Sequence, residues 1–219
     1  MKRFEIITES IARALEPGST VQLAPNGQIT PLAADTLRAM RVSVLRHGEI
    51  ASDETGLVGI SDFKTVAVGA DHTGVDLKRS VLAYLRERGL TATDLGTHST
   101  ERIDYPDIAA SVARAVIHGE ADAGIVIDGA GLGSAIAANK IAGIRSAMAS
   151  DPIVARYARE HVGVNVLTLG VRLVDTDRAV QVVEAWLSTT IREPRYRRQL
   201  VKIQRLEWAE ANKSGRMKD

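Results

Sequence analysis

The sequence predicts an α/β protein whose core is a parallel sheet covered by helices on both faces. From about residue 65 onward, short apolar runs that are typical of strands alternate with segments whose apolar residues recur at helical spacing. The strand-like runs are almost continuously apolar, as in strands that are buried on both faces. Strict alternation of strands and helices indicates crossover connections, and such connections join parallel neighbours.

Each element of this part has its own sequence signal. The expected strands are short apolar runs bounded by turn residues, at residues 65–69, 91–96, 124–127, 144–149 and 164–170. The expected helices have apolar residues three or four positions apart, at residues 75–89, 105–118, 134–140, 152–160 and 176–187. Gly89 is a helix stop signal, and Asp151 before Pro152 is an N-cap signal.

The first 46 residues depart from this pattern and predict a small α+β appendage. We expect a short helix within residues 6–19, capped by Thr8 or Ser10. Two strands then follow, joined by a turn at Asn26–Gly27, because Asn-Gly is a preferred two-residue hairpin turn. Thr30 before a proline predicts the start of a second helix, and a further strand follows it.

The chain is therefore expected to have four parts. Residues 1–46 form the appendage, and the polar, glycine-containing stretch 47–63 is interpreted as a linker. Residues 64–203 form the main domain, and residues 204–219 form a helical extension. The terminal helix begins near Arg195, and its apolar side predicts packing on the body or on a second subunit.

Composition excludes several classes of function. Among 219 residues, 28 basic and 27 acidic side chains nearly balance, so the overall charge favours neither nucleic acid nor a membrane surface. The chain has no cysteine, which excludes disulfides, thiolate metal sites and a cysteine nucleophile. No apolar run approaches the length of a membrane span, and the first residues lack a signal core. We expect a cytoplasmic protein, and because no pair of residues has the spacing of metal ligands, we expect no metal site. The family resemblance described below implies that no cofactor is needed.

Polar residues follow each predicted strand, where ligands bind in open parallel sheets. Asp71 and His72 follow the first strand, and Tyr105 lies beyond the second, after His98 and Asp104. The third strand ends at Asp128, before a turn with glycine at positions 129, 131 and 133. This spacing does not match the dinucleotide fingerprint. It allows backbone N–H groups to approach a phosphate or an enediolate, although a tight turn without a ligand would have the same glycines.

Five motifs together resemble a known family. In chain order they are GADHTGVDLK, GTHSTERIDYPD, GxGLGSAIAANKIAGIR, REHxxxNVLTLGVR and an arginine-rich tail. Over residues 65–203 they resemble the type B ribose-5-phosphate isomerases and the related galactose-6-phosphate isomerase subunits. The resemblance implies a doubly wound, flavodoxin-like sheet of five strands between two layers of helices. It also implies a homodimer or tetramer that interconverts aldose and ketose phosphates through an enediolate, with active sites between subunits.

The resemblance implies a role for each matching position. Asp71 orders the site and contacts sugar hydroxyl groups, His72 lies near the phosphate end, and His161 opens the sugar ring. The other implied substrate-binding residues are Gly129, Gly131 and Gly133 around the enediolate, Arg172, Arg195 and Arg198 at the phosphate, and Tyr105 and Asn139 of the shared motifs.

The chain departs from the family at the position of the base. One branch of the family has a cysteine at the position of Asp128, and another has a glutamate at the position of Ser134. Ala130 and Val162 also replace polar residues of the family, and its second tail arginine falls at Gln199, beside Arg198. A carboxylate can move a proton between two sugar carbons, so Asp128 is the leading candidate for the base. Alternatively, Asp128 binds a sugar hydroxyl in a non-catalytic protein or one with an altered substrate.

Residues 1–60 lie outside the family's usual extent. The pattern IITES…LAPNGQITPLAADTLR resembles short N-terminal segments of some enzymes of bacterial microcompartments. This second resemblance implies docking to a shell or core protein and a location inside such a compartment. The alternative is a small domain that packs on the isomerase and enlarges its subunit interface.

Overall fold

A computed structural model describes residues 3–45, 63–191 and 193–216 of the chain. The chain divides into two compact units, Met1–Gly59 and Ile60–Asp219, and each is described by itself. The predicted linker 47–63 lies almost wholly outside the described residues. No helix in the described ranges is long and apolar enough to span a bilayer.

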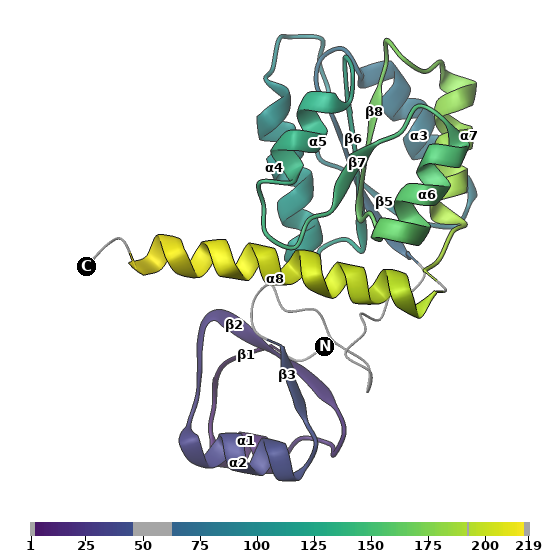
Figure 1. Cartoon of the computed structure of the whole chain (residues 1–219). Helices are drawn as coiled ribbons and strands as arrows, with labels where there is room; N and C mark the ends of the chain where they lie inside the picture. Colours follow the sequence, from purple (N-terminus) through teal and green to yellow (C-terminus); the bar gives the residue numbers. More distant parts are fainter. Residues whose placement is uncertain (1–2, 46–62, 192, 217–219) are drawn as a thin grey trace. The chain divides into compact units, whose positions relative to one another are not determined.

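The larger unit contains the predicted five-stranded parallel sheet (Figure 1). Its strands in chain order are β4 (Thr65–Ala70), β5 (Thr91–Asp94), β6 (Ala123–Asp128), β7 (Ser146–Met148) and β8 (Val166–Gly170). Across the sheet the order is β5-β4-β6-β8-β7, with every neighbouring pair parallel. The last two strands are thus exchanged relative to the usual flavodoxin order. Burial accounts for this exchange, because β8 is fully buried and needs two neighbours, whereas β7 is short and half-buried at an edge.

Helices cover both faces of this sheet, as predicted. They are α3 (Val75–Glu87), α4 (Tyr105–Ile117), α5 (Leu132–Ala138), α6 (Pro152–Val162) and α7 (Thr176–Leu187). One core cluster joins the sheet to α3, α6 and α7, and a second joins it to α4 and α5, on opposite sides in Figure 1. Trp186 of α7 is fully buried in the first cluster, and its indole N–H donates to the carbonyl of Val164 at 3.1 Å. The carbonyl before β8 therefore keeps a partner in the core.

The smaller unit has a different architecture from the predicted one. Its elements are β1 (Arg3–Ile7), α1 (Glu9–Arg13), β2 (Thr20–Ile29), α2 (Pro31–Ala39) and β3 (Ser43–Leu45). The strands form a parallel sheet in the order β1-β2-β3, and a core around Ile7, Leu23 and Leu37 joins it to the helices. The second helix begins as predicted, since the Thr30 hydroxyl accepts from Ala33 N–H.

The predicted hairpin at Asn26–Gly27 is wrong. β2 runs through these two residues, and both of its neighbours are parallel to it. Pairing shifts from Phe4 opposite Leu23 to Ile6 opposite Gln28, so the residues between are accommodated as an irregularity within one strand. The first predicted helix is also too long, because part of it belongs to β1. The segments of β2 on either side of Asn26–Gly27 both pair in parallel with β1, so the antiparallel hairpin does not form despite the local turn preference of Asn-Gly.

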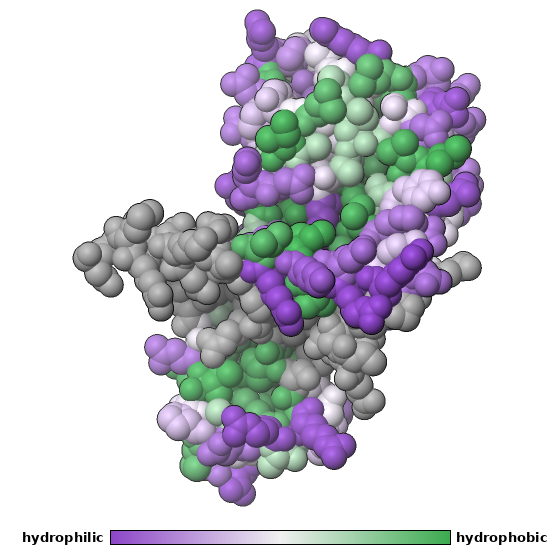
Figure 2. Space-filling model, in the orientation of Figure 1, coloured by the Kyte–Doolittle hydropathy of each residue, from purple (hydrophilic) through white to green (hydrophobic). Residues whose placement is uncertain are grey.

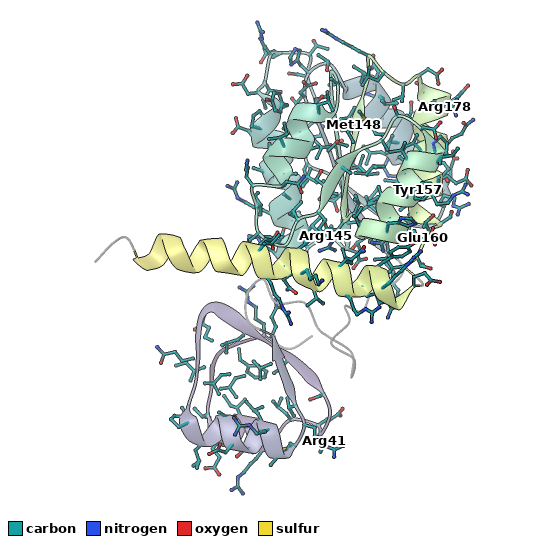
Figure 3. All side chains as sticks on the ribbon, viewed as in Figure 1. Arg41, Arg145, Met148, Tyr157, Glu160 and Arg178 are labelled. Atoms are coloured by element: carbon teal, nitrogen blue, oxygen red, sulfur yellow. The ribbon has the colours of Figure 1, made fainter. Side chains whose placement is uncertain are left out.

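An apolar surface remains exposed on α5 and α6 of the larger unit. Leu132 and Ile136 of α5 and Ile153, Val154 and Tyr157 of α6 are all between 46% and 63% exposed. Figure 2 shows apolar residues on this side of the unit, and Figure 3 shows the Tyr157 side chain on α6. Several exposed apolar side chains on one side of a domain are typical of an interaction surface.

The predicted terminal helix is α8 (Pro194–Arg216), and it continues without a break past residue 203. It lies across the end of the unit where α5 and α6 end (Figure 1). The Glu207 carboxylate accepts from Gly143 N–H at 3.0 Å, and Leu200 is buried. Arg145, labelled in Figure 3, donates from Nε to the Gly163 carbonyl at 2.9 Å. Burial lowers the pKa of Arg145, while the Glu207 carboxylate opposes this effect.

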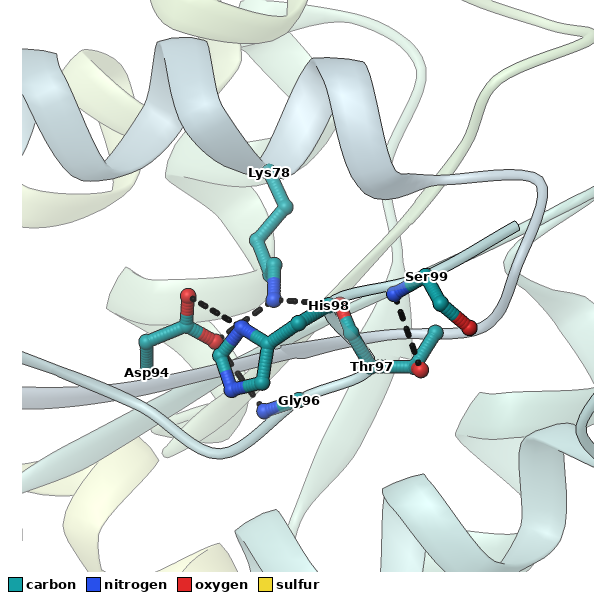
Figure 4. Close-up of polar contacts among 6 residues, drawn as sticks. All are labelled: Lys78, Asp94, Gly96, Thr97, His98 and Ser99. Atoms are coloured by element: carbon teal, nitrogen blue, oxygen red, sulfur yellow. Dashed lines mark hydrogen bonds and ion pairs between the residues drawn. The ribbon is translucent and has the colours of Figure 1, made fainter. Parts of the chain in front are cut away.

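A buried lysine connects α3 to the loop that follows β5 (Figure 4). Lys78 is 1% exposed, and its Nζ donates to Asp94 Oδ1 at 2.6 Å and to the Thr97 carbonyl at 2.7 Å. Gly96 N–H also donates to Asp94 Oδ1, at 3.0 Å, and His98 Nδ1 lies 3.5 Å from Oδ2. Burial alone would raise the pKa of Asp94, but the hydrogen bonds from Lys78 and Gly96 outweigh it and hold the pKa below its usual value. The Asp94 carboxylate thereby fixes the start of the loop that carries His98.

The depressed pKa of Asp94 predicts a specific dependence of stability on pH. At pH 6 the Asp94→Asn variant is expected to lose about 3 kcal/mol of unfolding free energy, because the buried Lys78 ammonium loses its counter-charge. The wild-type advantage is complete above the unfolded-state pKa of about 3.9 and disappears as pH falls through the lower folded-state pKa. Urea unfolding followed by tryptophan fluorescence reports the larger unit, which holds both tryptophans.

The matched control is Asp76→Asn, because Asp76 pairs with Arg79 on the exposed surface of α3. This variant is expected to change the unfolding free energy by less than about 1 kcal/mol at every pH. A gap between wild type and Asp94→Asn that stayed constant from pH 6 to pH 3 would contradict the role assigned to Asp94.

Candidate active site

The carboxyl ends of β4, β6 and β8 lie side by side and gather the polar residues that follow them. Asp71 follows β4, and its N–H donates to the Ile127 carbonyl of β6 at 3.0 Å. Asp128 ends β6 opposite Gly170 of β8, and Val171 N–H donates to the Asp128 carbonyl at 2.9 Å. This arrangement follows from the parallel register, because each strand continues its neighbour's hydrogen bonding up to the same edge.

Asp128 is buried at this edge and its carboxylate accepts four hydrogen bonds. Only 4% of the residue is exposed. Oδ1 accepts from Ala130 N–H at 2.7 Å and from Gly131 N–H, and Oδ2 accepts from Ser134 N–H at 3.1 Å and from the Ser134 hydroxyl. These donors compensate the cost of burying a charged group. A buried strand can therefore end in an acid, because the N–H groups of the glycine loop fold around the Asp128 carboxylate and donate to it.

The glycine loop packs tightly against β7 and β8. Gly131 has φ of 75°, a left-handed conformation that favours glycine, and a Cβ there would lie 2.8 Å from Met148 Cγ and 3.1 Å from Gly170 N. The Gly131 carbonyl accepts from the buried Thr168 hydroxyl at 2.7 Å. The Gly131 N–H donates to Asp128, so it is not free to bind a ligand oxygen. Gly131 therefore contributes to the site through the left-handed turn of its backbone.

Two predicted residues lie directly beside the loop. An added Cβ on Gly133 would lie 2.6 Å from ring atoms of Tyr105, which starts α4, so the ring packs on the loop backbone. At the other end of the loop, Arg172 Nε lies 3.8 Å from the position that a Cβ on Gly129 would take. Arg172 N–H also donates to the Gly129 carbonyl at 3.0 Å. A cation therefore borders one side of the loop and a phenol ring the other.

Asp71 and His72 form the neighbouring side of this edge. Asp71 is 7% exposed, and its Oδ1 accepts from Thr73 N–H at 2.8 Å and from the Thr73 hydroxyl at 2.5 Å. His72 Nδ1 accepts a long hydrogen bond, 3.5 Å, from Ile103 N–H in the loop after β5. In a neutral ring, an acceptor at Nδ1 places the hydrogen on Nε2.

The remaining predicted residues lie at the opposite end of the sheet. A crossover helix starts after the carboxyl end of one strand and ends before the amino end of the next, so His161 at the end of α6 lies at the amino edge. Its ring stacks on Tyr196 of α8, with centroids 4.1 Å apart, and meets the Tyr157 ring edge-on at 4.6 Å. Arg195 donates to the Tyr196 hydroxyl at 2.8 Å, and Arg198 is exposed on the same helix.

Asn139 also belongs to this second group. It follows the last residue of α5, and its side-chain amide donates to the carbonyls of Ala135 and Ser146 at 2.9 and 2.8 Å. Its Oδ1 accepts from Ser146 N–H at 2.8 Å. The side chain thus ties the end of α5 to the start of β7 through backbone groups.

Within one chain, the predicted residues therefore form two separate groups. The carboxyl-edge group is Asp71, His72, Tyr105, Asp128, Gly129, Gly131, Gly133 and Arg172, and the amino-edge group is Asn139, His161, Arg195 and Arg198. Sequence reasoning missed the contact of Ser134 with Asp128. Ser134 is the third residue after the Gly131 N-cap, so its N–H belongs to the first turn of α5 and needs an acceptor from outside the helix, which is the signal that could have indicated this contact. In the described part of the chain, no three His, Asp or Glu side chains are arranged to hold a metal ion.

Comparison with known proteins assigns the larger unit to a family. A model of the ribose/galactose isomerase family matches residues 66–203. Ribose-5-phosphate isomerase B of Escherichia coli K12 is 44% identical over 144 residues, which cover 66% of this chain and 97% of that protein. D-erythrulose-4-phosphate isomerase of Pectobacterium atrosepticum is 39% identical over 124 residues, covering 56% of this chain and 82% of that protein.

A solved structure agrees with this assignment. Ribose-5-phosphate isomerase B of Clostridium thermocellum superposes with a TM-score of 0.65 at 43% sequence identity, covering 67% of this chain and 99% of that one. The match supports the predicted doubly wound, three-layer fold. From the family model, the relatives and the shared fold together, the chain belongs to the ribose/galactose isomerase family, whose members in these comparisons are sugar-phosphate isomerases.

Proposed function

We propose that this chain interconverts an aldose phosphate and a ketose phosphate without a cofactor, with ribose 5-phosphate and ribulose 5-phosphate as the first pair to test. The observation that carries this proposal is the Asp128 carboxylate beneath a glycine loop, with the Arg172 guanidinium beside it. A carboxylate can accept the proton that moves between C1 and C2, and an arginine can hold a phosphate. Relatives named for a pentose and for a tetrose phosphate support the substrate class.

The proposed reaction uses the carboxyl-edge group for proton transfer. Asp128 removes the proton from C2 of the open-chain aldose, the C–H electron pair forms the C1=C2 double bond, and the carbonyl pair moves onto O1 to give the enediolate. A proton then passes from O2 to O1, Asp128 returns its proton to C1, and C2 becomes the carbonyl carbon of the ketose. Gly129, Gly131 and Gly133 allow the loop backbone to approach the enediolate oxygens. Asp71 orders the sugar hydroxyl groups, and Tyr105 packs over the loop.

The amino-edge group is proposed to act across a subunit interface. His161 opens the sugar ring, Arg195 and Arg198 join Arg172 and His72 at the phosphate, and Asn139 supports the interface. Within one chain, Asp128 lies at the carboxyl edge of the sheet and His161 at the amino edge. They can serve a single site only if two copies of the chain contribute one residue each. The exposed apolar residues of α5 and α6 are suited to the contact of a homodimer or tetramer.

Replacing Asp128 with asparagine tests the base directly. Across a panel of four- to six-carbon sugar phosphates, Asp128→Asn is expected to lower kcat by about 10²- to 10⁴-fold and to leave KM nearly unchanged, because the amide cannot accept the proton. The exposed substitution Asp76→Asn is the control and should retain wild-type kcat. Full activity of Asp128→Asn on the best substrate would show that another group is the base.

The alternative is a protein that binds a sugar phosphate without turning it over, or that acts on an altered substrate. The replaced positions Ala130 and Val162 and the fully hydrogen-bonded Asp128 are the observations that favour it. Ligand-dependent thermal stabilisation without deuterium incorporation from D₂O into any sugar of the panel would support this alternative over catalysis.

Shared sites predict recovery of activity on subunit mixing. Asp128→Asn and His161→Ala are each expected to be inactive, but a mixed dimer has one site with both native residues. In a statistical mixture, half of the dimers are mixed and half of their sites are intact, so about a quarter of wild-type activity should return. Co-expression with two affinity tags isolates the mixed dimers themselves, in which one site of two is intact, so about half of wild-type activity is expected there. Mixing Asp128→Asn with Asp128→Ala is the control, and recovery no greater than this control would contradict sharing.

We also propose that residues 1–60 dock the enzyme to a shell or core protein of a bacterial microcompartment, and that the enzyme resides there. The segment precedes the residues that match the family model, and it forms a compact unit of its own. Its apolar residues Ile6 and Leu32 are 53% and 58% exposed. The competing role is enlargement of the subunit interface.

Deletion of residues 1–60 separates these two roles. If the segment docks the enzyme, the shortened chain is expected to keep kcat within about twofold and to lose co-sedimentation with microcompartments, since the matched domain begins after it. The control is the double substitution Ile6→Ser and Leu32→Ser in the full chain. Loss of solubility or of the oligomer on deletion would favour the interface role instead.

A further inference from the structure

The Asp128 carboxylate has no open acceptor position in its resting state. A carboxylate offers about four lone-pair positions, two on each oxygen. Here Oδ1 accepts from two loop N–H groups, and Oδ2 accepts from the N–H and the hydroxyl of Ser134. A base must present a free lone pair to the C–H bond that it breaks, so one of these donors has to turn away before Asp128 can act.

Only one of the four donors can move without moving the backbone. Three are backbone N–H groups, held by the left-handed Gly131, by the first turn of α5 and by the contact of the loop with β8. The fourth is the Ser134 hydroxyl, whose hydrogen turns about the Cβ–Oγ bond. Ser134 is fully buried in the resting state, so bulk water does not compete for its hydroxyl hydrogen, and a bound sugar reaches it by displacing atoms that cover the loop.

We propose that Ser134 is the positioning residue that controls when Asp128 can accept a proton, an inference that rests on the proposed isomerase function. When an open-chain sugar phosphate lies against the loop, the Ser134 hydrogen turns from Asp128 Oδ2 to the C1 carbonyl oxygen of the aldose. Oδ2 then accepts the proton from C2, the C–H pair becomes the C1=C2 double bond, and the carbonyl pair moves onto O1, where the hydroxyl stabilises the new oxyanion. A proton passes from O2 to O1, Asp128 returns its proton to C1 as the C2 carbonyl forms, and the resting hydrogen bond is restored.

The loop does not depend on the Ser134 hydroxyl for its shape. Three N–H donors hold Asp128 without it, and the Thr168 hydroxyl binds the Gly131 carbonyl from β8 at 2.7 Å. Thr168 is fully buried like Ser134 but has no hydrogen bond to Asp128. The Thr168→Val variant is therefore the matched control. It removes a buried hydroxyl of β8 that binds the loop, without removing a donor to the Asp128 carboxylate.

Replacing Ser134 by alanine tests the proposal through the separate responses of kcat and KM. Ser134→Ala is expected to lower kcat about 100-fold and to keep KM within about threefold, because the donor to the new oxyanion is lost while the contacts that bind the sugar phosphate remain. Ser134→Cys keeps a weaker donor and should lie between alanine and wild type. Thr168→Val should destabilise the protein to heat and keep kcat within about threefold of wild type.

A second readout needs no turnover. At about pH 7 the ¹³C NMR shift of the Asp128 carboxyl carbon should change in Ser134→Ala, because the carboxylate loses a hydrogen-bond donor, and should remain at the wild-type position in Thr168→Val. If wild type turns over no sugar phosphate, the isomerase proposal fails, while this NMR shift still decides whether Ser134 acts on the carboxylate. Equal effects of Ser134→Ala and Thr168→Val, or an unchanged kcat and carboxyl shift in Ser134→Ala, would overturn the proposal.

Discussion

The structure around the candidate site depends on one interaction, the capture of the Asp128 carboxylate by the loop that follows it. A buried carboxylate is costly, and the donors of Ala130, Gly131 and Ser134 remove that cost by folding the loop around it. The same interaction sets the path of the chain into α5 and brings the loop against β8, where Gly170 leaves no room for a Cβ beside Ala130. The acid is therefore both the support of the loop and the group in the position of a base.

The handedness of the fold imposes a second constraint on the site. Every crossover returns the chain to the amino edge of the sheet, and this places His161 and the first turns of α8 away from Asp128. Tyr157 and Tyr196 hold the His161 ring at that end. A reaction that needs residues from both edges of the sheet therefore depends on the association of subunits. The exposed apolar side chains of α5 and α6 favour contact with another copy of the chain.

Sequence reasoning succeeded where local pattern and tertiary context agree. The central strands β4, β6 and β8 are apolar runs that are buried in the sheet, and the N-caps at Thr30 and Asp151 form as expected. It failed at the Asn26–Gly27 turn, because the segments before and after these residues both pair in parallel with β1 instead of with each other. Local composition carries no information about such pairing partners, and it likewise does not fix the order of β7 and β8.

The sequence alone determined the alternating α/β architecture, the family motifs and the polar residues at the ends of the strands, because periodicity and turn chemistry are local properties. The family resemblance also marked Asp128, Ala130 and Ser134 as positions of the glycine motif where the chain departs from its relatives. Only the tertiary structure decided that the Asp128 and Ser134 side chains share a hydrogen bond, that the Gly131 N–H is already used, and that His161 lies at the opposite edge. Those facts depend on where a seven-residue helix begins and where crossover helices end, which is settled by packing across the whole sheet.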